Sequence, residues 1–120
     1  MARILVAEDN VLLLKAIQHT LELNGYSVCG VINGVQALRA FSHFRPQVIV
    51  ADVLMPEMDG FELYRRVRRE SPSMATPFVF ISVMDAAQAV KQVASNGSAH
   101  FLRKPFGSEE LLEAVHRCLG

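Results

Sequence analysis

The chain of 120 residues is long enough for one domain, and its composition, 51% hydrophobic and 20% charged, excludes a disordered protein. Twelve basic residues balance twelve acidic ones, which argues against a protein built mainly to hold nucleic acid or an anionic membrane. The first apolar run, residues 2–7, is too short for a signal peptide or a membrane span. Cys29 and Cys118 lie far apart with no metal-ligand spacing, so we expect reduced thiols and a cytoplasmic protein.

The first part of the chain predicts two strands, each followed by a helix. Residues 4–7 are a buried-strand run that ends at the acidic pair Glu8-Asp9, and Asp9 or Asn10 can cap the next helix. That helix ends at Asn24-Gly25, and its apolar stripe consists of Val11, Leu14, Ile17 and Leu21. Residues 26–31 are predicted as a strand broken by Gly30. The apolar positions of the following helix, which Pro46 ends, are Val35, Leu38 and Phe41.

The stretch from Gln47 to Gly60, QVIVADVLMPEMDG, organises the middle of the chain. Its uncharged run at residues 48–51 is rich in β-branched residues and predicts a strand that is buried on both faces, as in a parallel sheet. The run stops at Asp52, and a loop containing Pro56 and Asp59-Gly60 follows. In open α/β sheets ligands bind at the carboxyl ends of the strands, so Asp52 is a candidate functional residue. The alternative is that Asp52 only caps the next turn.

The next helix, residues 61–70, combines an inward apolar stripe with four arginines. The stripe is Leu63, Tyr64 and Val67, and the arginines are Arg65, Arg66, Arg68 and Arg69. A solvated helix face near the carbonyl end of the helix dipole explains these arginines better than an anion or nucleic-acid patch, because the chain is neutral.

The last part of the chain predicts two more strand–helix units. Residues 78–81 form a buried strand that ends on Ser82, and Asp85 with Gln88 resembles a capping box for a helix that Asn96-Gly97 ends. Residues 99–103 form the last strand, which leads into Lys104-Pro105-Phe106, and Ser108 is the predicted cap of the final helix. The apolar face of that helix is Leu111, Leu112, Val115 and Leu119.

Five strand–helix units in succession predict an α/β fold, a doubly wound parallel sheet with helices on both faces. Its carboxyl edge collects polar residues from four strand ends, namely Glu8, Asp9, Asp52, Ser82 and Lys104. Three carboxylates need a counter-charge, and Mg²⁺ binds through one or two carboxylates, waters and a phosphate. Lys104 and the Ser82 hydroxyl can bind phosphate oxygens, and Asp52 can attack phosphorus as a nucleophile. The set is what phosphoryl transfer to Asp52 requires.

Over residues 2–119 the chain resembles the receiver domain of two-component response regulators, CheY-like proteins. The resemblance depends on Glu8-Asp9, Asp52 in DVLMPEMDG, Ser82 after FVFI, and Lys104 in KPF, which occur in order at family-like spacing. It implies a (βα)5 flavodoxin-like fold with strand order 2-1-3-4-5. It also implies a single receiver domain over residues 1–120, with no effector domain in this chain.

The resemblance further implies a signalling switch rather than an enzyme, with Mg²⁺-dependent self-phosphorylation and autodephosphorylation as its only catalysis. Asp52 would be the phosphoacceptor for a histidine kinase or a phosphotransfer protein, and Ser82 and Lys104 would bind the phosphoryl oxygens. Asp9, Asp52 and the carbonyl of Leu54 would hold Mg²⁺, with Glu8 mostly through water. A cis bond at Lys104-Pro105 is expected from the family and is plausible for an X–Pro pair.

The family resemblance also assigns a conformational switch. Ser82 would move toward the phosphoryl group, and Phe101, three residues before Lys104, would swing inward. The alternative for Phe101 is a permanently buried core ring. The signalling surface would be roughly residues 85–119, facing a downstream effector, and activation can include homodimerisation. Direct binding of nucleic acid or membrane is not expected.

Three positions near the site are apolar where the family often differs. Val83 follows Ser82 where a small residue is more usual, so access to Asp52 is expected to be narrower. Leu54 and Met84 flank the expected path of the hydrolytic water and cannot orient it by hydrogen bonding. The hypothesis is therefore a long-lived phosphorylated state.

Three other functions are open to the same sequence. A phosphatase with an aspartyl intermediate commonly carries a second acid two residues after the nucleophile, where this chain has Leu54. A flavodoxin-like binder of a nucleotide phosphate needs a glycine- or hydroxyl-rich loop after the first strand, where this chain has Glu8-Asp9. A degenerate receiver used only for docking is disfavoured because all the key residues are present.

Overall fold

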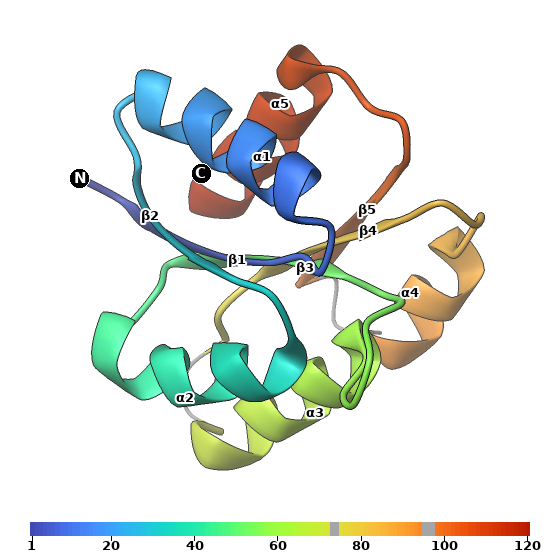
Figure 1. The fold of residues 1–120 in the computed structure, drawn as a ribbon. Helices are drawn as coiled ribbons and strands as arrows, with labels where there is room; N and C mark the ends of the chain where they lie inside the picture. The colour runs from blue at the N-terminus through green and yellow to red at the C-terminus, as the bar shows by residue number, and fades with distance from the viewer. Residues whose placement is uncertain (73–74, 95–97) are drawn as a thin grey trace.

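The fold is a five-stranded parallel sheet with strand order β2-β1-β3-β4-β5, covered by helices on both faces (Figure 1). In this computed structural model of residues 1–120, the structure describes residues 1–72, 75–94 and 98–120. The strands are β1 (Arg3–Ala7), β2 (Ser27–Val31), β3 (Val48–Asp52), β4 (Phe78–Ser82) and β5 (Ala99–Arg103). The helices are α1 (Val11–Leu23), α2 (Gly34–Phe44), α3 (Gly60–Glu70), α4 (Ala87–Val93) and α5 (Ser108–Leu119). The predicted fold class and strand order are confirmed.

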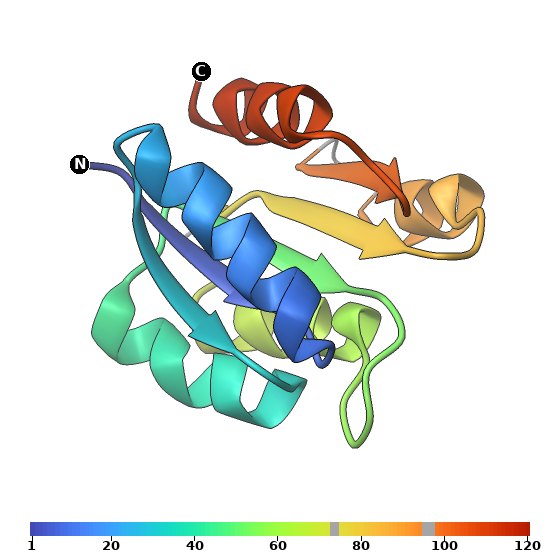
Figure 2. The same cartoon turned by 45° about the horizontal axis from the view of Figure 1, so that its top comes forward.

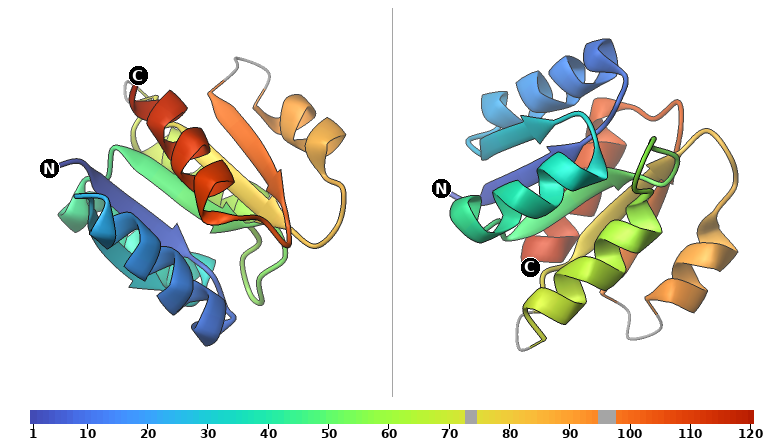
Figure 3. Two further views of the ribbon diagram at one scale, coloured as in Figure 1. Left: turned by 90° about the horizontal axis from the view of Figure 1, so that it is seen from above. Right: turned by 60° about the horizontal axis from the view of Figure 1, so that its bottom comes forward.

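Each helix lies on one of two faces of the sheet, with α1 and α5 on one and α2, α3 and α4 on the other (Figure 3). Alternate residues of the central strands supply the two cores: Ile4 and Val6 of β1 pack beneath α1 and α5, while Leu5 and Ala7 pack on the opposite side. The central strands β1, β3 and β4 are buried almost throughout, whereas the edge strands β2 and β5 are half-buried. Burial on both faces explains the uninterrupted apolar runs in the central strands.

Parallel pairing places all five carboxyl ends at one edge, and the strand arrows in Figure 2 point the same way. Of the two residues predicted as the cap of the first helix, Asn10 is confirmed. Asn10 caps α1 and Asn33 caps α2, each by accepting a hydrogen bond from the backbone N–H three residues further along the chain. Asp59 caps α3 in the same way, through Glu62 N at 2.8 Å. These caps satisfy donors that the first helical turn leaves unpaired.

Two predicted caps are wrong by one residue. The N-cap of α4 is Ala86, without a side-chain cap, and Asp85 instead accepts a hydrogen bond from Ala87 N at 3.3 Å. The N-cap of α5 is Gly107, whose N–H donates to the Glu110 carboxylate at 3.0 Å. The carboxylate of Glu110, rather than the predicted Ser108 side chain, therefore makes the capping hydrogen bond at the start of α5. The predicted helix end at Asn96-Gly97 lies outside the described residues, and α4 itself ends at Val93.

Two details of the first half also differ from prediction. Strand β2 runs through Gly30 rather than breaking there, and a Cβ at this position would contact Gln18 and Leu14 of α1. Gly30 therefore permits close packing of α1 on the strand. Val11, expected in the apolar stripe of α1, is 49% exposed, since the buried positions are Leu14, Ile17 and Leu21.

The arginines of α3 are not equivalent. Arg65, Arg66 and Arg69 are exposed and contact the Glu62 carboxylate, as expected for a solvated face. Arg68 instead lies over the Tyr64 ring at 4.4 Å and donates to the carbonyl of Thr76 at 2.8 Å. It thereby connects the end of α3 to the segment before β4.

Among the described residues, no helix is long and apolar enough to cross a membrane.

Candidate functional site

The carboxyl edge of the sheet brings together the residues that the sequence singled out. Asp52 and Ser82 are the last residues of β3 and β4, and Glu8 and Lys104 directly follow β1 and β5. Asp9 follows Glu8 at the same edge. The order β2-β1-β3-β4-β5 makes β1, β3, β4 and β5 successive neighbours, so residues nearly a hundred positions apart in sequence meet in one place.

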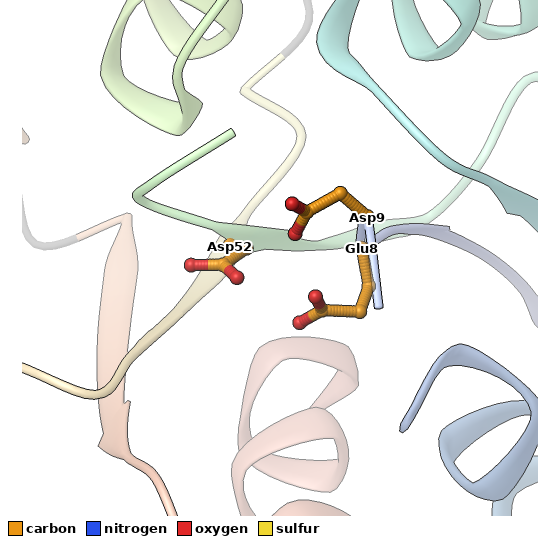
Figure 4. A group of neighbouring side chains, drawn as sticks. All are labelled: Glu8, Asp9 and Asp52. Atoms are coloured by element: carbon orange, nitrogen blue, oxygen red, sulfur yellow. The ribbon is translucent and has the colours of Figure 1, made fainter. Parts of the chain in front are cut away.

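Three carboxylates form the centre of this edge. One oxygen from each of Glu8, Asp9 and Asp52 lies within 4.8 Å of the others. Figure 4 shows the Asp9 and Glu8 side chains on either side of the β1 end, both facing Asp52. Glu8 and Asp52 are buried, whereas Asp9 is exposed to solvent. Such a group of hard oxygen donors, open on one side, suits a divalent cation that keeps part of its water shell.

Lys104 is the only cation that the described residues place against these carboxylates. Its Nζ lies 2.7 Å from Asp52 Oδ2 and 2.7 Å from Glu8 Oε1, and its side chain is only 14% exposed. The contact with Asp52 is a hydrogen bond, whereas buried Glu8 Oε1 has an ion pair but no hydrogen bond among the described atoms. One ammonium cannot neutralise three carboxylates, so the cluster has charge and acceptor capacity left for another cation.

Burial and neighbouring charges shift the pKa values of two members of the cluster. Burial raises the pKa of Glu8 to about 7 from its ordinary 4.5, although the adjacent ammonium of Lys104 and the hydrogen bond from the Asn10 N–H act in the opposite direction. Burial lowers the pKa of Lys104, but the close contacts with Asp52 and Glu8 and the negative charges of these two groups outweigh burial, so the pKa of Lys104 is raised. Lys104 is therefore charged at neutral pH, and Glu8 is the group whose protonation varies there.

The three carboxylates fit Mg²⁺, because their donor atoms are all oxygen and their charge is only partly neutralised. The backbone N–H of Leu54 donates to Asp52 Oδ1 at 3.0 Å, which orients the carboxylate from the loop side. Lys104 holds the other oxygen. Asp52 is thus fixed from two directions, as a nucleophile or a ligand requires.

Ser82 is buried at the end of β4, next to the site. Its hydroxyl oxygen accepts a hydrogen bond from Met84 N at 3.2 Å, and its carbonyl accepts one from Lys104 N at 2.7 Å. The second bond connects the ends of β4 and β5 and brings Lys104 to the edge. The peptide bond between Lys104 and Pro105 is cis, as expected.

Phe101, the residue assigned to the switch, is half-buried on β5. It pairs in register with Phe80 of β4 and packs against the core beneath α2, α3 and α4. The ring is therefore not a fully buried core residue.

Gly60 secures the loop that follows Asp52. A Cβ at this position would lie 2.5 Å from the Asp52 carbonyl oxygen, a distance that real Cβ atoms do not show. Its N–H donates to the Val53 carbonyl at 3.0 Å, so α3 begins directly against the end of β3. The sequence identified Asp59-Gly60 as a turn but gave no sign of this contact.

Apolar side chains surround the site, a feature that sequence reasoning identified only in part. Leu54, Val83 and Met84 are 51%, 60% and 58% exposed. Beside them is a cavity of about 330 Å³ lined by Leu13, Val83, Lys104, Pro105 and Phe106. The sequence contained one sign of this apolar surface: Leu12 and Leu13 are leucines that fall outside the buried stripe of α1.

The fold is a doubly wound sheet with an acidic cluster and a lysine at its carboxyl edge. Comparison with known proteins identifies the family that has this arrangement. Residues 4–116 match the family described as "Response regulator receiver domain". The chain is 33% identical over 117 residues to the response regulator MprA of Mycobacterium sp. (strain KMS), covering 98% of this chain and 50% of the relative. The chain therefore belongs to the response regulator receiver family.

Solved structures agree. The Vibrio cholerae chemotaxis protein CheY4 superposes with a TM-score of 0.89 at 34% identity, covering 98% of both chains. The Francisella response regulator 1452 receiver domain gives a TM-score of 0.85 at 29% identity, covering 98% of this chain and 96% of that one. The chain spans about half the length of the curated relatives that it matches.

Proposed function

We propose that this receiver domain is a phosphorylation-activated switch in which Asp52 accepts a phosphoryl group from a phosphohistidine of a histidine kinase or phosphotransfer protein. The observation that supports this is the setting of Asp52. Its carboxylate is hydrogen-bonded to Lys104 and Leu54 N, and it faces two further carboxylates at a sheet edge. The proposal includes residues 1–120 as one receiver domain acting in the cytoplasm.

In the transfer step an oxygen of Asp52 attacks phosphorus in line with the bond to the donor histidine. That P–N bond breaks, its electron pair stays on the imidazole nitrogen, and an acyl phosphate forms on Asp52. Lys104, which is 2.7 Å from Asp52 Oδ2, is close enough to move onto a phosphoryl oxygen. The raised pKa of Lys104 supports this role, because the lysine is charged when the phosphoryl group arrives.

Mg²⁺ would be held by Asp9, Asp52 and the carbonyl of Leu54, with Glu8 mostly through water. When bound, it would neutralise charge on the incoming phosphoryl group. Glu8 and Asp9 keep this position acidic, and burial of Glu8 beside Lys104 holds its carboxylate in place. The apolar side chains around the site favour a protein donor that docks over it, and they limit access of water.

Phosphorylation would then act on the surface formed by α4, β5 and α5. The Ser82 hydroxyl, which accepts from Met84 N at 3.2 Å, would turn to the phosphoryl group. The half-buried ring of Phe101 would follow inward, changing a surface that a downstream effector or a second receiver reads. The domain itself would make no direct contact with nucleic acid.

Intact mass after incubation with Mg²⁺ and acetyl phosphate tests the proposal. The wild type is expected to gain one phosphoryl group, whereas Asp52→Ala and wild type without Mg²⁺ gain none. Glu57→Gln is the matched control, an exposed acid five residues along the same loop, and is expected to behave as wild type.

An adduct on Asp52→Ala, or one independent of Mg²⁺, would contradict the proposed acceptor or its metal. No adduct on folded wild type, from either acetyl phosphate or a phosphorylated histidine phosphotransfer protein, would favour a docking module instead.

A further inference from the structure

A groove between α2 and α3 lies away from the acidic cluster, on the face of the sheet that α1 and α5 do not cover. The two helices run next to one another there (Figure 3, right). The groove is a cavity of about 710 Å³, lined by Val35, Leu38, Arg39, Ser42, His43, Met58, Arg66, Arg69 and Glu70. A second cavity of about 250 Å³ shares Ser42 and Glu70 with it and adds Arg45. Together these cavities follow the α2–α3 seam, and we call them the α2–α3 groove.

The floor of the α2–α3 groove is apolar. Val35 and Leu38 are half-buried positions on α2, and Met58 is buried in the loop before α3. These three side chains offer a short hydrophobic strip between two helices. A strip of this kind accepts the apolar face of a third helix by ridge-into-groove packing.

The rim of the groove is basic in a chain whose formal charge is zero. Arg39, Arg45, Arg66 and Arg69 line it, against one acid, Glu70. Glu62 lies 2.9 Å from Arg66 and 3.5 Å from Arg69, but it also contacts Arg65 at 3.5 Å, so three guanidinium groups share one carboxylate. The guanidinium of Arg39 has no hydrogen bond or ion pair among the described residues. The rim therefore carries positive charge that the domain itself does not compensate.

We propose that the α2–α3 groove is a docking site for an acidic amphipathic helix of a protein partner. The apolar face of such a helix covers Val35, Leu38 and Met58, and its glutamates or aspartates meet the arginines of the rim. Helix α2 has 11 residues, or about 16 Å, so the groove holds about three turns of a partner helix. The apolar floor and the neutral chain favour this occupant over nucleic acid, whose backbone needs charge without a hydrophobic strip. The proposal does not rest on phosphorylation of Asp52.

Fluorescence anisotropy with a labelled helical peptide tests this assignment on the unphosphorylated chain. The probe is an amphipathic peptide of about 15 residues, with leucine on one face and glutamate on its flanks. It is expected to bind, whereas the same peptide with lysine in place of glutamate is not. Arg39→Glu combined with Arg66→Glu is expected to weaken binding by about tenfold or more. Leu38→Gln is expected to weaken binding of the peptide as well, because it places a polar amide on the apolar floor of the groove.

Arg65→Glu is the matched control, because Arg65 is adjacent to Arg66 and also contacts Glu62 but does not line the groove. It is expected to change affinity by less than about twofold. If the Arg39→Glu, Arg66→Glu variant does not fold, as judged by circular dichroism, Arg39→Gln combined with Arg66→Gln replaces it. This variant is expected to weaken binding of the peptide by a smaller factor.

Equal loss in Arg65→Glu, equal binding of the lysine peptide, or tighter binding of a DNA duplex at the same ionic strength would overturn the proposal. A dimer seen by sedimentation that the Arg39→Glu, Arg66→Glu variant no longer forms would also overturn the proposal, because the groove would then bind a second copy of the chain.

Discussion

At the scale of single residues, the acidic cluster has more negative charge than the domain itself neutralises. Lys104 is within 2.7 Å of both buried carboxylates, while exposed Asp9 has no ion pair among the described residues. Repulsion between Asp9 and its two neighbours is therefore a cost that the metal-free domain bears and that a bound cation removes.

Asp9→Asn is expected to stabilise the metal-free domain by roughly 0.5–1 kcal/mol, because it removes that repulsion at an exposed position. If Asp9 is a ligand of Mg²⁺, as proposed, Mg²⁺ is expected to stabilise the wild type and to have no such effect on Asp9→Asn. Thermal unfolding with and without Mg²⁺ measures both effects. Asp85→Asn, an exposed acid outside the cluster, should leave both unchanged; a less stable metal-free Asp9→Asn would show that Asp9 has a favourable partner instead.

The raised pKa of Glu8 predicts that the affinity for Mg²⁺ depends on pH. Since the folded pKa of about 7 exceeds the ordinary 4.5, the metal-free domain gains stability from the protonated form. That gain is complete below pH 4.5 and is lost as pH rises through about 7. Mg²⁺ needs the ionised carboxylate, so its affinity is expected to rise by about tenfold between about pH 6 and about pH 8. Lys104 stays charged throughout this range and does not contribute to the change.

Titration calorimetry in two buffers of different ionisation enthalpy checks this dependence. Proton release is expected to accompany binding near pH 6 and to vanish near pH 8. Glu8→Gln should bind Mg²⁺ with little dependence on pH. A dependence that survives in Glu8→Gln would assign the titration to another group.

At the scale of secondary-structure elements, the start of α3 fixes the loop that follows Asp52 at the end of β3. Gly60→Ala is expected to destabilise the domain by about 1–3 kcal/mol and to slow phosphorylation, because the new Cβ would lie 2.5 Å from the Asp52 carbonyl oxygen. Denaturant unfolding and the rate of mass increase with acetyl phosphate give the two readouts. Gly107→Ala, where the nearest atom is 3.7 Å away, is the steric control. It is expected to cost only the weaker N-cap preference of alanine at the start of α5, about 0.5–1 kcal/mol, and not to slow phosphorylation.

Elements were predictable where the signal was local. The side chains of Asn10 and Asp59 each cap a helix by themselves, and the sequence predicted a cap at Asp9 or Asn10 and a loop that includes Asp59-Gly60 before the next helix. The caps of α4 and α5 could not be chosen in the same way. Their N-cap residues are Ala86 and Gly107, neither of which has a side chain that can accept a capping hydrogen bond, so no residue pattern marked them.

At the scale of the whole molecule, the apolar side chains around the site bear on how long a phosphorylated state lasts. Leu54 and Met84 are exposed beside Asp52 and Ser82, and neither can hold a hydrolytic water by a hydrogen bond. The double variant Leu54→Asn, Met84→Glu is therefore expected to lose its phosphoryl group severalfold faster than wild type. Loss of the adduct over time by intact mass measures this. Equal decay would show that access or metal, rather than these two side chains, sets the lifetime.

The sequence by itself determined the order of the elements, the strand ends and the residues placed there. The apolar runs that end at Glu8-Asp9, Asp52 and Ser82 are local signals. Five predicted strands that alternate with helices leave few ways to build a sheet. Only the tertiary structure decided that Lys104 holds Glu8 and Asp52 together, that Arg68 turns inward while its neighbours form a basic rim, and that Gly60 abuts the end of β3. These contacts join residues from different elements, and their distances depend on how helices pack on the sheet, which no local pattern specifies.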